Sequence, residues 1–375
     1  MAQQTFYETG AVKIGDMNLE SGKMLSEVEM AFERAGPKDA PVILVCHALT
    51  GNQYTVGNHE QKGWWKGLIF DGGYVDTNQY QVLTFNVLGG CDGSTGPTSI
   101  NPITGQSYNG KFPFITVKDM VKAQYLALEK LDIHHLKAVI GGSLGGMQVL
   151  EWGIQFPQAV EVLFPLAVTP SLSDFGIAFN HISRTAILND PNWNDGHYSR
   201  EQIPDKGLAL ARMIGMLTYR TDSLFGERFH RSECLRDGER HHKPSFEIES
   251  YLNYQGEKLT SRFDANSYLY LLKAMDLHDI GKGRAGWNGA IKEINAQIVA
   301  IGFSNDLVYP PEKLQHFVIA CENHDKSADY FEVETQFGHD GFLVEFEKWG
   351  YIIRNKLTQL ELISSNASEM RALEN

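Results

Sequence analysis

The sequence predicts an α/β fold with a mostly parallel central sheet, helices on both of its faces and a helical segment inserted late in the chain. Three observations predict it. Short apolar runs typical of strands buried on both faces recur along the chain, and stretches of helical periodicity separate them. Between residues 171 and 290 these runs are absent, and helical patterns rich in polar and aromatic residues replace them. We therefore predict a core of residues 1–170 and 291–375 and a helical lid of residues 171–290.

The composition and charge of the chain argue against several functional classes. Of its 375 residues 42% are hydrophobic and 21% are charged, which is ordinary for a globular protein. The net charge is −13 and no cluster of Lys and Arg is present, so nucleic acid is not expected as a partner. No apolar stretch reaches about 18 residues, and no signal-peptide pattern is visible, so no membrane association is expected. The four cysteines lack a C-x-x-C motif, which predicts reduced thiols and a cytoplasmic location.

The first half of the sheet is predicted from alternation and from apolar runs. Residues 1–35 alternate apolar and polar positions around glycine turns, which indicates antiparallel strands at a sheet edge. Residues 41–46 and 80–85 are continuous apolar runs and are expected to be buried strands. Between them we expect a helix near residues 63–70, which carries Trp64 and Trp65.

The middle of the core is predicted as helix, strand, helix and strand. Residues 116–119 begin like a capping box, and the apolar positions that follow are spaced three and four apart. That helix leads into the strand before Ser143, and the next helix stops at Pro157. Residues 160–168 form the following strand, in which Pro165 predicts a bulge or an early end.

The end of the chain returns to strand and helix patterns. Residues 296–301 and 330–333 are predicted strands, and residues 342–361 a final helix. The lid carries helical periodicity over residues 206–218 and 267–277.

Residues 141–145 match G-x-S-x-G, the nucleophile elbow in which a serine occupies a strained turn between a strand and a helix. The flanking glycines are a steric need, because strand and helix backbones approach too closely there for side chains. An isolated match is as readily an ordinary glycine-rich loop. The strand before Ser143 and the helix after it favour the elbow.

The chain order of the α/β-hydrolase fold, in which this elbow occurs, is Ser, then Asp or Glu, then His. Asp306 follows the predicted strand 296–301, and His339 follows the predicted strand 330–333. Alone, such an Asp is usually a turn former and such a His a surface or core residue. Their joint order and strand-end placement predict a triad of Ser143, Asp306 and His339. His47 precedes Ser143 and is therefore not expected to be the base.

Acyl transfer also needs an oxyanion hole. In this fold one backbone N–H comes from the residue after the nucleophile, Leu144, and the other from the loop after an early strand, where Leu49 is the expected donor. No H-E-x-x-H motif or Cys/His spacing predicts a metal.

Several segments together resemble the homoserine O-acyltransferase family, the homoserine O-acetyltransferases in particular. They are spread from about residue 40 to 350 and several are long and unusual. The segments are CHALTG (46–51), NVLGGCDGSTGP (86–97), IGGSLGGMQVLEW (140–152), YRT (219–221), RFDANSYLYLLKAMD (262–276), DLVYP (306–310) and GHDGFLVE (338–345).

The resemblance implies an α/β-hydrolase core with a helical lid and a metal-free triad at Ser143, Asp306 and His339. It implies transfer of acetyl from the co-substrate acetyl-CoA to L-homoserine through an acetyl-serine, in methionine biosynthesis, without a permanently bound cofactor. It also implies that Arg212 binds the carboxylate of homoserine, that Asp340 binds its ammonium group, and that the lid forms a homodimer. Without the resemblance, Arg212 would be read as a solvated helix arginine.

Four alternatives stay open at this point. Succinyl-CoA relatives place an arginine in the loop after the catalytic aspartate, whereas residues 307–310 here carry no cation, which favours acetyl over succinyl. L-Serine differs from homoserine by one methylene, and such discrimination is worth only ~1–3 kcal/mol. A serine esterase with the same triad and a catalytically silent interaction module are the remaining alternatives.

Overall fold

The computed structural model describes residues 6–199, 201–234 and 243–373. Its main sheet has eight strands in the order β1-β2-β6-β3-β7-β8-β9-β10. Pairing is antiparallel between β1 and β2 and between β2 and β6, and parallel from β6 to β10. The strands are β1 Tyr7–Asn18, β2 Met24–Ala35, β3 Val42–Cys46, β6 Gln81–Phe85, β7 Leu136–Gly142, β8 Val160–Leu166, β9 Gln297–Phe303 and β10 Ala328–Val333. The predicted edge hairpin and mostly parallel sheet are confirmed.

Helices cover both faces of the sheet because its central strands are apolar on both. Along β3 the side chain of Leu44 packs into one hydrophobic cluster, and those of Ile43 and Val45 pack into another. The first cluster holds residues of α1, α2, α8 and α9, and the second holds residues of α10. These helices are α1 Val117–Lys130, α2 Leu144–Gln155, α8 Gly286–Glu293, α9 Pro311–Glu322 and α10 Phe346–Leu373.

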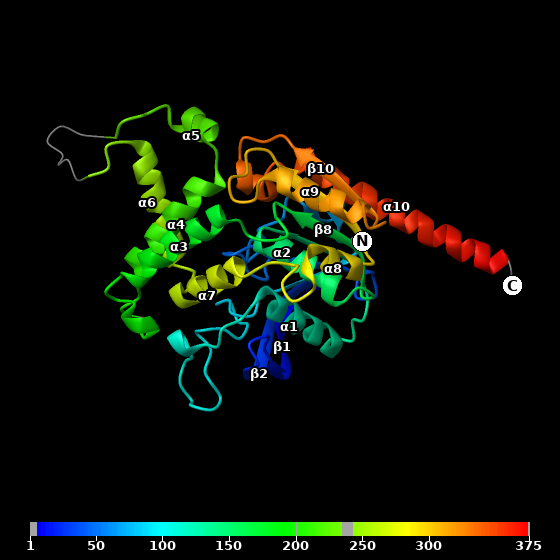
Figure 1. Cartoon of the computed structure of the whole chain (residues 1–375), viewed down its shortest axis with the longest axis horizontal. Coiled ribbons are helices and arrows are strands. Elements are labelled where there is room, and N and C mark those ends of the chain that lie inside the picture. The colour runs from blue at the N-terminus through cyan, green and yellow to red at the C-terminus, as the bar shows by residue number, and fades with distance from the viewer. Residues whose placement is uncertain (1–5, 200, 235–242, 374–375) are drawn as a thin grey trace.

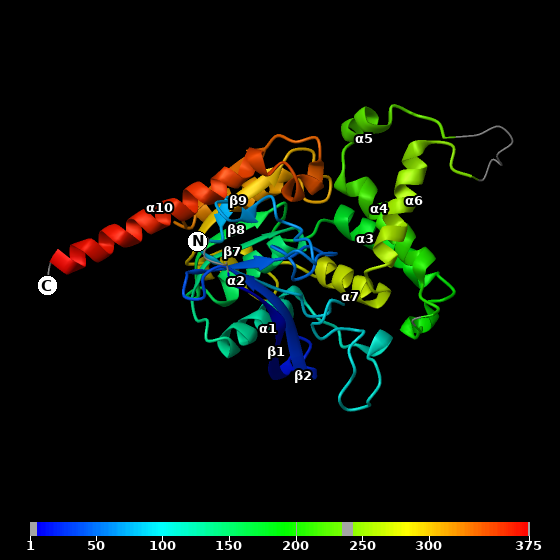
Figure 2. The ribbon, with the colours of Figure 1, turned by 180° about the vertical axis from the view of Figure 1, so that it is seen from behind.

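Between β8 and α8 the described residues form five α-helices. In Figures 1 and 2 most of them gather beyond one end of the sheet, and α7 lies nearest to the core. Tyr268, Leu271 and Leu272 of α7 are buried in the same cluster as α1 and α2. The helices are α3 Asp174–Leu188, α4 Asp205–Tyr219, α5 Asp222–Phe229, α6 Glu247–Thr260 and α7 Ala265–Asp276. The division into core and lid at residues 171 and 290 stays a prediction.

The helix expected near residues 63–70 is absent, and this prediction was wrong. The segment forms turns and then β4 (Ile69–Phe70), which pairs with β5 (Val75–Asp76). The backbone N–H groups of Trp64 and Trp65 donate to the carbonyls of Tyr54 and Thr55, which pairs the start of the segment with the loop before it. The Trp65 indole donates to the carbonyl of Phe342 at 2.9 Å, which holds the segment against the C-terminal part of the chain.

Two predicted details of the later elements have different outcomes. The strand β8 ends at Leu166, and Ala167 has a φ of 44°, so the early end predicted from Pro165 is confirmed. The last helix begins at Phe346 rather than at residue 342, because Gly338–Leu343 forms a 3-10 helix.

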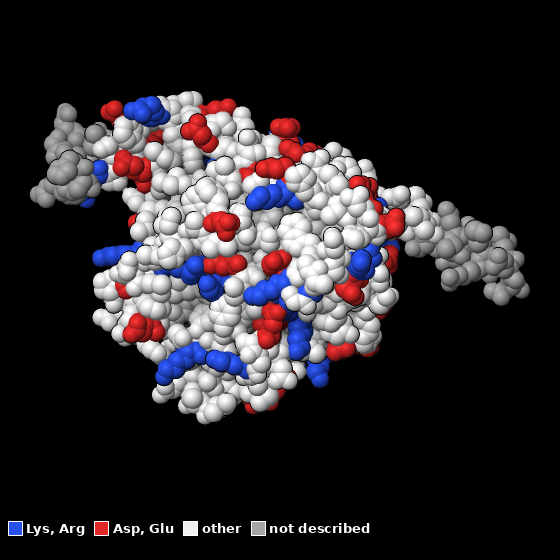
Figure 3. All heavy atoms as spheres, in the orientation of Figure 1, with Lys and Arg blue, Asp and Glu red and all other residues white. Residues whose placement is uncertain are grey.

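The face shown in Figure 3 has acidic and basic side chains interspersed among uncharged ones. None of the described helices is long and apolar enough to cross a membrane.

Candidate active site

Ser143 lies in the tight turn between β7 and α2. Its φ is 59° and its ψ is −125°, a backbone conformation that a non-glycine residue adopts only where its surroundings enforce it. A Cβ at Gly145 would collide with the backbone carbonyl of Cys46, and one at Gly141 would lie 2.8 Å from the same oxygen. The close approach of β3, and at Gly141 also of the backbone of Gly145, therefore requires both glycines, as the elbow motif predicts.

Asp306 lies in the loop after β9, and His339 lies in the 3-10 helix after β10. Nδ1 of His339 is 2.7 Å from Oδ2 of Asp306, and both side chains are buried. The other oxygen of Asp306 accepts the backbone N–H groups of Val308 and Tyr309, each at 2.9 Å. A proton on Nδ1 that is donated to the carboxylate leaves Nε2 as the basic nitrogen of the ring.

The aromatic side chains around His339 connect it to the turn at Ser143. The ring of Phe342 is 5.4 Å from the His339 ring, and it packs so closely over Gly142 that a Cβ there would overlap it. The ring of Tyr309 is 5.1 Å from the His339 ring. The Tyr309 hydroxyl lies beside the Ser143 hydroxyl. The three residues predicted as a triad are thus brought to one edge of the sheet.

The loop after β3 lies beside this turn, and His47 supports it. Nε2 of His47 accepts the backbone N–H of Val87 at 3.0 Å, and Nδ1 is 2.7 Å from the carbonyl of Ala48. Burial lowers the pKa of His47 to about 4, so its ring is neutral at pH 7. Both ring nitrogens are occupied, which leaves neither of them to act on Ser143.

The two expected oxyanion donors are both buried. Leu144 is the first residue of α2, so its N–H has no acceptor within the helix. Leu49 belongs to the loop after β3, whose carbonyls at Cys46 and His47 lie against Gly145 of the elbow. Among the described residues, no group of three or more His, Cys, Asp or Glu side chains is arranged as a metal site.

The two residues expected to bind the amino-acid substrate approach His339 from different elements. Arg212 on α4 places its guanidinium carbon 5.7 Å from the centre of the Tyr219 ring, and that ring is 5.5 Å from His339. Asp340 follows His339 directly, and its Oδ2 accepts from Nε of Arg220 at 2.9 Å.

Three residues at the site were not assigned from the sequence. Arg220 pairs with Asp340 and also donates to the hydroxyl of Tyr251 at 2.6 Å. Tyr219 and Tyr309 enclose His339, and burial raises the pKa of each hydroxyl. All three belong to short segments that carried the family resemblance, so the signal was present without a role attached to it.

Comparison with known proteins adds the family to this geometry. A family model for the alpha/beta hydrolase fold matches residues 41–346. The homoserine O-acetyltransferase of Carboxydothermus hydrogenoformans is 44% identical over 359 residues, which span 93% of this chain and 95% of that protein. The chain belongs to the homoserine O-acetyltransferase family.

Solved structures with a similar backbone include a member of this family and also a protein with another name. The family member from Bacillus anthracis, a homoserine O-acetyltransferase, superposes with a TM-score of 0.87 at 28% identity, covering 95% of this chain and 98% of its own. Esterase E22 superposes with a TM-score of 0.86 at 27% identity, covering 94% of this chain and all of its own. A backbone of this shape is therefore found in proteins named for acetyl transfer and in proteins named for ester hydrolysis.

Proposed function

We propose that this protein transfers the acetyl group of acetyl-CoA to the hydroxyl of L-homoserine, a step in methionine biosynthesis that we place in the cytoplasm. The observation that carries the proposal is the near full-length identity of 44% to a relative named for this activity. The hydrogen bond between His339 and Asp306, next to the strained turn at Ser143, supports it chemically.

In the first half-reaction Ser143 attacks the thioester carbonyl of acetyl-CoA. Nε2 of His339 takes the serine proton, and Asp306 stabilises the resulting imidazolium through Nδ1. The N–H groups of Leu49 and Leu144 hold the oxyanion. The C–S bond then breaks, the sulfur of CoA leaves with the proton from His339, and acetyl-Ser143 remains.

In the second half-reaction homoserine, rather than water, accepts the acetyl group from Ser143. His339 takes the proton of its γ-hydroxyl, and the oxygen attacks the ester carbon. Arg212 binds the carboxylate of homoserine, and Asp340, with one oxygen already held by Arg220, binds its ammonium group. Residues 171–290 act as the lid that excludes water and holds the alcohol in place.

The acyl donor is assigned from the loop after Asp306. Residues 307–310 carry no cation, so the second carboxylate of a succinyl group would lie there without a charged partner. The test measures CoA release for acetyl-CoA and succinyl-CoA, each with homoserine and with serine. Acetyl-CoA with homoserine is expected to be the best pair, and a higher kcat/KM for succinyl-CoA with homoserine would refute the assignment.

Ester hydrolysis is the second candidate, because esterase E22 shares this backbone over nearly the whole chain. A transferase and a hydrolase differ in what attacks the acyl-enzyme. Homoserine is expected to accelerate CoA release from acetyl-CoA strongly. Equal rates of release with and without homoserine would favour the hydrolase.

We also propose that the lid forms a homodimer. Ile182 on α3 and Leu210 on α4 are exposed apolar side chains, and both line a cavity of about 600 Å³ between these helices. Light scattering on the purified protein is expected to give twice the chain mass, and Ile182→Glu with Leu210→Glu is expected to give the monomer. A monomeric mass for the unaltered protein would contradict the proposal.

A further inference from the structure

Tyr309 carries a buried hydroxyl next to Ser143 that makes no well-formed hydrogen bond within the described part of the chain. The residue is 1% exposed, and its Oη atom is shielded from solvent without a hydrogen bond of normal geometry to any described residue. A buried hydroxyl without a partner is costly, so a group of this kind in a native protein calls for an explanation. One explanation is that a group bound in the site accepts a hydrogen bond from this hydroxyl.

The position of Tyr309 is fixed by its backbone and by a contact of its ring. Its backbone N–H donates to Asp306 at 2.9 Å, and Pro310 follows it as the cap of α9. Its ring lies against that of His339, with the centroids 5.1 Å apart. The hydroxyl is therefore held among the reacting groups, beside the side chain of Ser143.

The hydroxyl stays protonated in this place. Burial raises the pKa of Tyr309 well above its usual range, and the neighbouring Ser143 hydroxyl only partly offsets this. At neutral pH Tyr309 is thus a neutral donor that does not lose its proton.

The chemistry of Ser143 changes during the proposed reaction in a way that suits such a donor. As a free serine, Oγ donates its own proton to the base. As an ester, Oγ has no proton and accepts hydrogen bonds only. In the breakdown of the acyl-enzyme Oγ is the leaving group, and charge develops on it as its bond to the acyl carbon breaks.

We propose that Tyr309 is a catalytic hydrogen-bond donor to Oγ of acylated Ser143, and that it stabilises this oxygen as the leaving group. The inference rests on the proposed role of Ser143 as the nucleophile. The hydroxyl of the alcohol that accepts the acyl group gives its proton to Nε2 of His339, and the oxygen of that hydroxyl forms the new bond to the acyl carbon. The C–Oγ bond breaks, the electron pair stays on Oγ, and Oγ takes the proton back from His339. Tyr309 keeps its own proton throughout.

The test separates acylation from deacylation in Tyr309→Phe. 4-Nitrophenyl acetate serves as the acyl donor, so acetyl-Ser143 forms independently of any CoA specificity. Stopped-flow absorbance gives the burst of nitrophenolate, and mass spectrometry of quenched samples gives the decay of acetyl-Ser143 with and without homoserine. We expect decay to slow on the order of 10-fold, the worth of about one neutral hydrogen bond. The burst is expected to change by less than about 3-fold, because a donor to the attacking oxygen does not help its attack.

Stability distinguishes this role from a structural one. Because the hydroxyl makes no hydrogen bond of normal geometry to a described residue, Tyr309→Phe is expected to leave the Tm unchanged or to raise it by ~1–2 °C. Tyr270→Phe is the matched control, since its partly buried hydroxyl donates to the carbonyls of Gly110 and Phe112. That variant is expected to lower the Tm and to leave both acyl-enzyme rates within about 2-fold of the unaltered protein.

Each outcome decides the matter. Equal slowing of burst and decay, an unchanged decay, or a variant that does not fold would overturn the proposal for Tyr309. Acylation of the unaltered protein by nitrophenyl acetate but not by acetyl-CoA would refute the proposed donor alone. If neither nitrophenyl acetate nor acetyl-CoA acylates the protein, Ser143 is not the nucleophile, and the proposal for Tyr309 fails as well.

Discussion

Single residues at the site are held in states that only their surroundings make stable. Ser143 has a positive φ in the sharp turn from β7 to α2, and the glycines on either side of it leave room for the end of β3. Asp306 is buried with one oxygen on His339 and the other on two backbone N–H groups. Each of these states is costly in isolation, and together they leave the proposed nucleophile and base little freedom.

Replacing Asp306 by Asn tests the proposed orientation of the base. The amide can offer an N–H toward Nδ1 of His339, which moves the ring proton to Nε2 and blocks proton removal from Ser143. We expect kcat to fall on the order of 10³- to 10⁴-fold while thermal unfolding stays cooperative. Steady-state CoA release measures kcat, and circular dichroism measures thermal unfolding. Asp329→Asn, on the exposed part of β10, is the control, and comparable kcat losses in both variants would contradict the assignment.

Gly145→Ala tests the close approach of β3 to the elbow. The new Cβ would overlap the carbonyl of Cys46, which is backbone and cannot swing away. We expect a loss of about 2–3 kcal/mol in the free energy of unfolding, measured by urea denaturation. Gly226→Ala in α5 is the matched control, because nothing lies within 4 Å of its added Cβ. It is expected to stabilise by about 0.5–1 kcal/mol, and similar losses in both variants would mean that the approach is not what requires Gly145.

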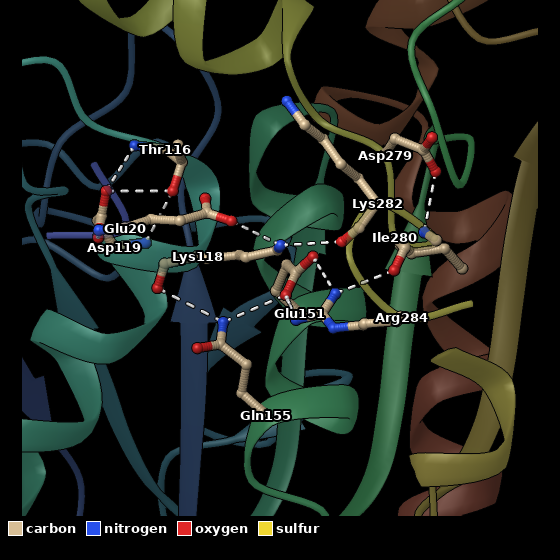
Figure 4. Close-up of polar contacts among 11 residues, drawn as sticks. Glu20, Thr116, Lys118, Asp119, Glu151, Gln155, Asp279, Ile280, Lys282 and Arg284 are labelled. Atoms are coloured by element: carbon tan, nitrogen blue, oxygen red, sulfur yellow. Dashed lines mark hydrogen bonds and ion pairs between the residues drawn. The ribbon is translucent and has the colours of Figure 1, made fainter. Parts of the chain in front are cut away.

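Among the elements, the connection from α7 to α8 is joined to the core by a polar network. Figure 4 shows Arg284 from this connection directed at Glu151 of α2, and Lys118 of α1 between Glu20 and the carbonyl of Lys282. Nη1 and Nη2 of Arg284 donate to the two oxygens of Glu151 at 2.9 and 2.7 Å. Glu151 is only 1% exposed, so this ion pair is buried on the side of the carboxylate.

Arg284→Ala should therefore be strongly destabilising. It leaves the carboxylate of Glu151 buried without its cation, and we expect a loss of about 3 kcal/mol in the free energy of unfolding. The double variant Glu151→Leu with Arg284→Met is expected to lose less than the single one, because no unpaired charge remains. Asp329→Ala, which breaks a half-exposed pair with Lys356, should cost less than about 1 kcal/mol. Urea denaturation measures the free energy of unfolding of all three variants. A double variant that is less stable than Arg284→Ala would contradict the argument.

For the whole molecule, the buried histidines make stability depend on pH. Burial lowers the pKa of His47 and of His278 to about 4, against 6.5 for an ordinary histidine. Between these values the unfolded chain binds protons that the folded protein does not, so each histidine removes stability as the pH falls. Burial raises the pKa of Glu33 and Asp119, which acts in the opposite sense. The histidine contribution is best isolated by substitution.

His278→Gln isolates one contribution. From the two pKa values, the unaltered protein should lose about 2 kcal/mol more than the variant between pH 7 and pH 5. The measurement is the free energy of unfolding by urea at each pH. His134→Gln, at an exposed position, is the control and should leave the difference between the two pH values unchanged. Parallel pH dependence in His278→Gln and in the unaltered protein would show that His278 does not titrate as its burial implies.

Much of the architecture and part of the site could be predicted from the sequence because the relevant signals are local. Apolar runs and helical spacing mark strands and helices, and the elbow at Ser143 and the strand-end positions of Asp306 and His339 follow from them. The segment around Trp64 and Trp65 shows the limit. Its backbone donors go to a loop ten residues earlier in the chain, which no local pattern reports.

The sequence by itself determined the order of elements and the candidate nucleophile, base and acid, because these depend on residue type and on spacing within short segments. Tertiary structure decided which side chains meet. It paired Asp340 with Arg220, 120 positions away, and placed the buried hydroxyl of Tyr309 beside Ser143. Such contacts depend on the packing of distant segments against each other, and side-chain spacing along the chain carries no record of it.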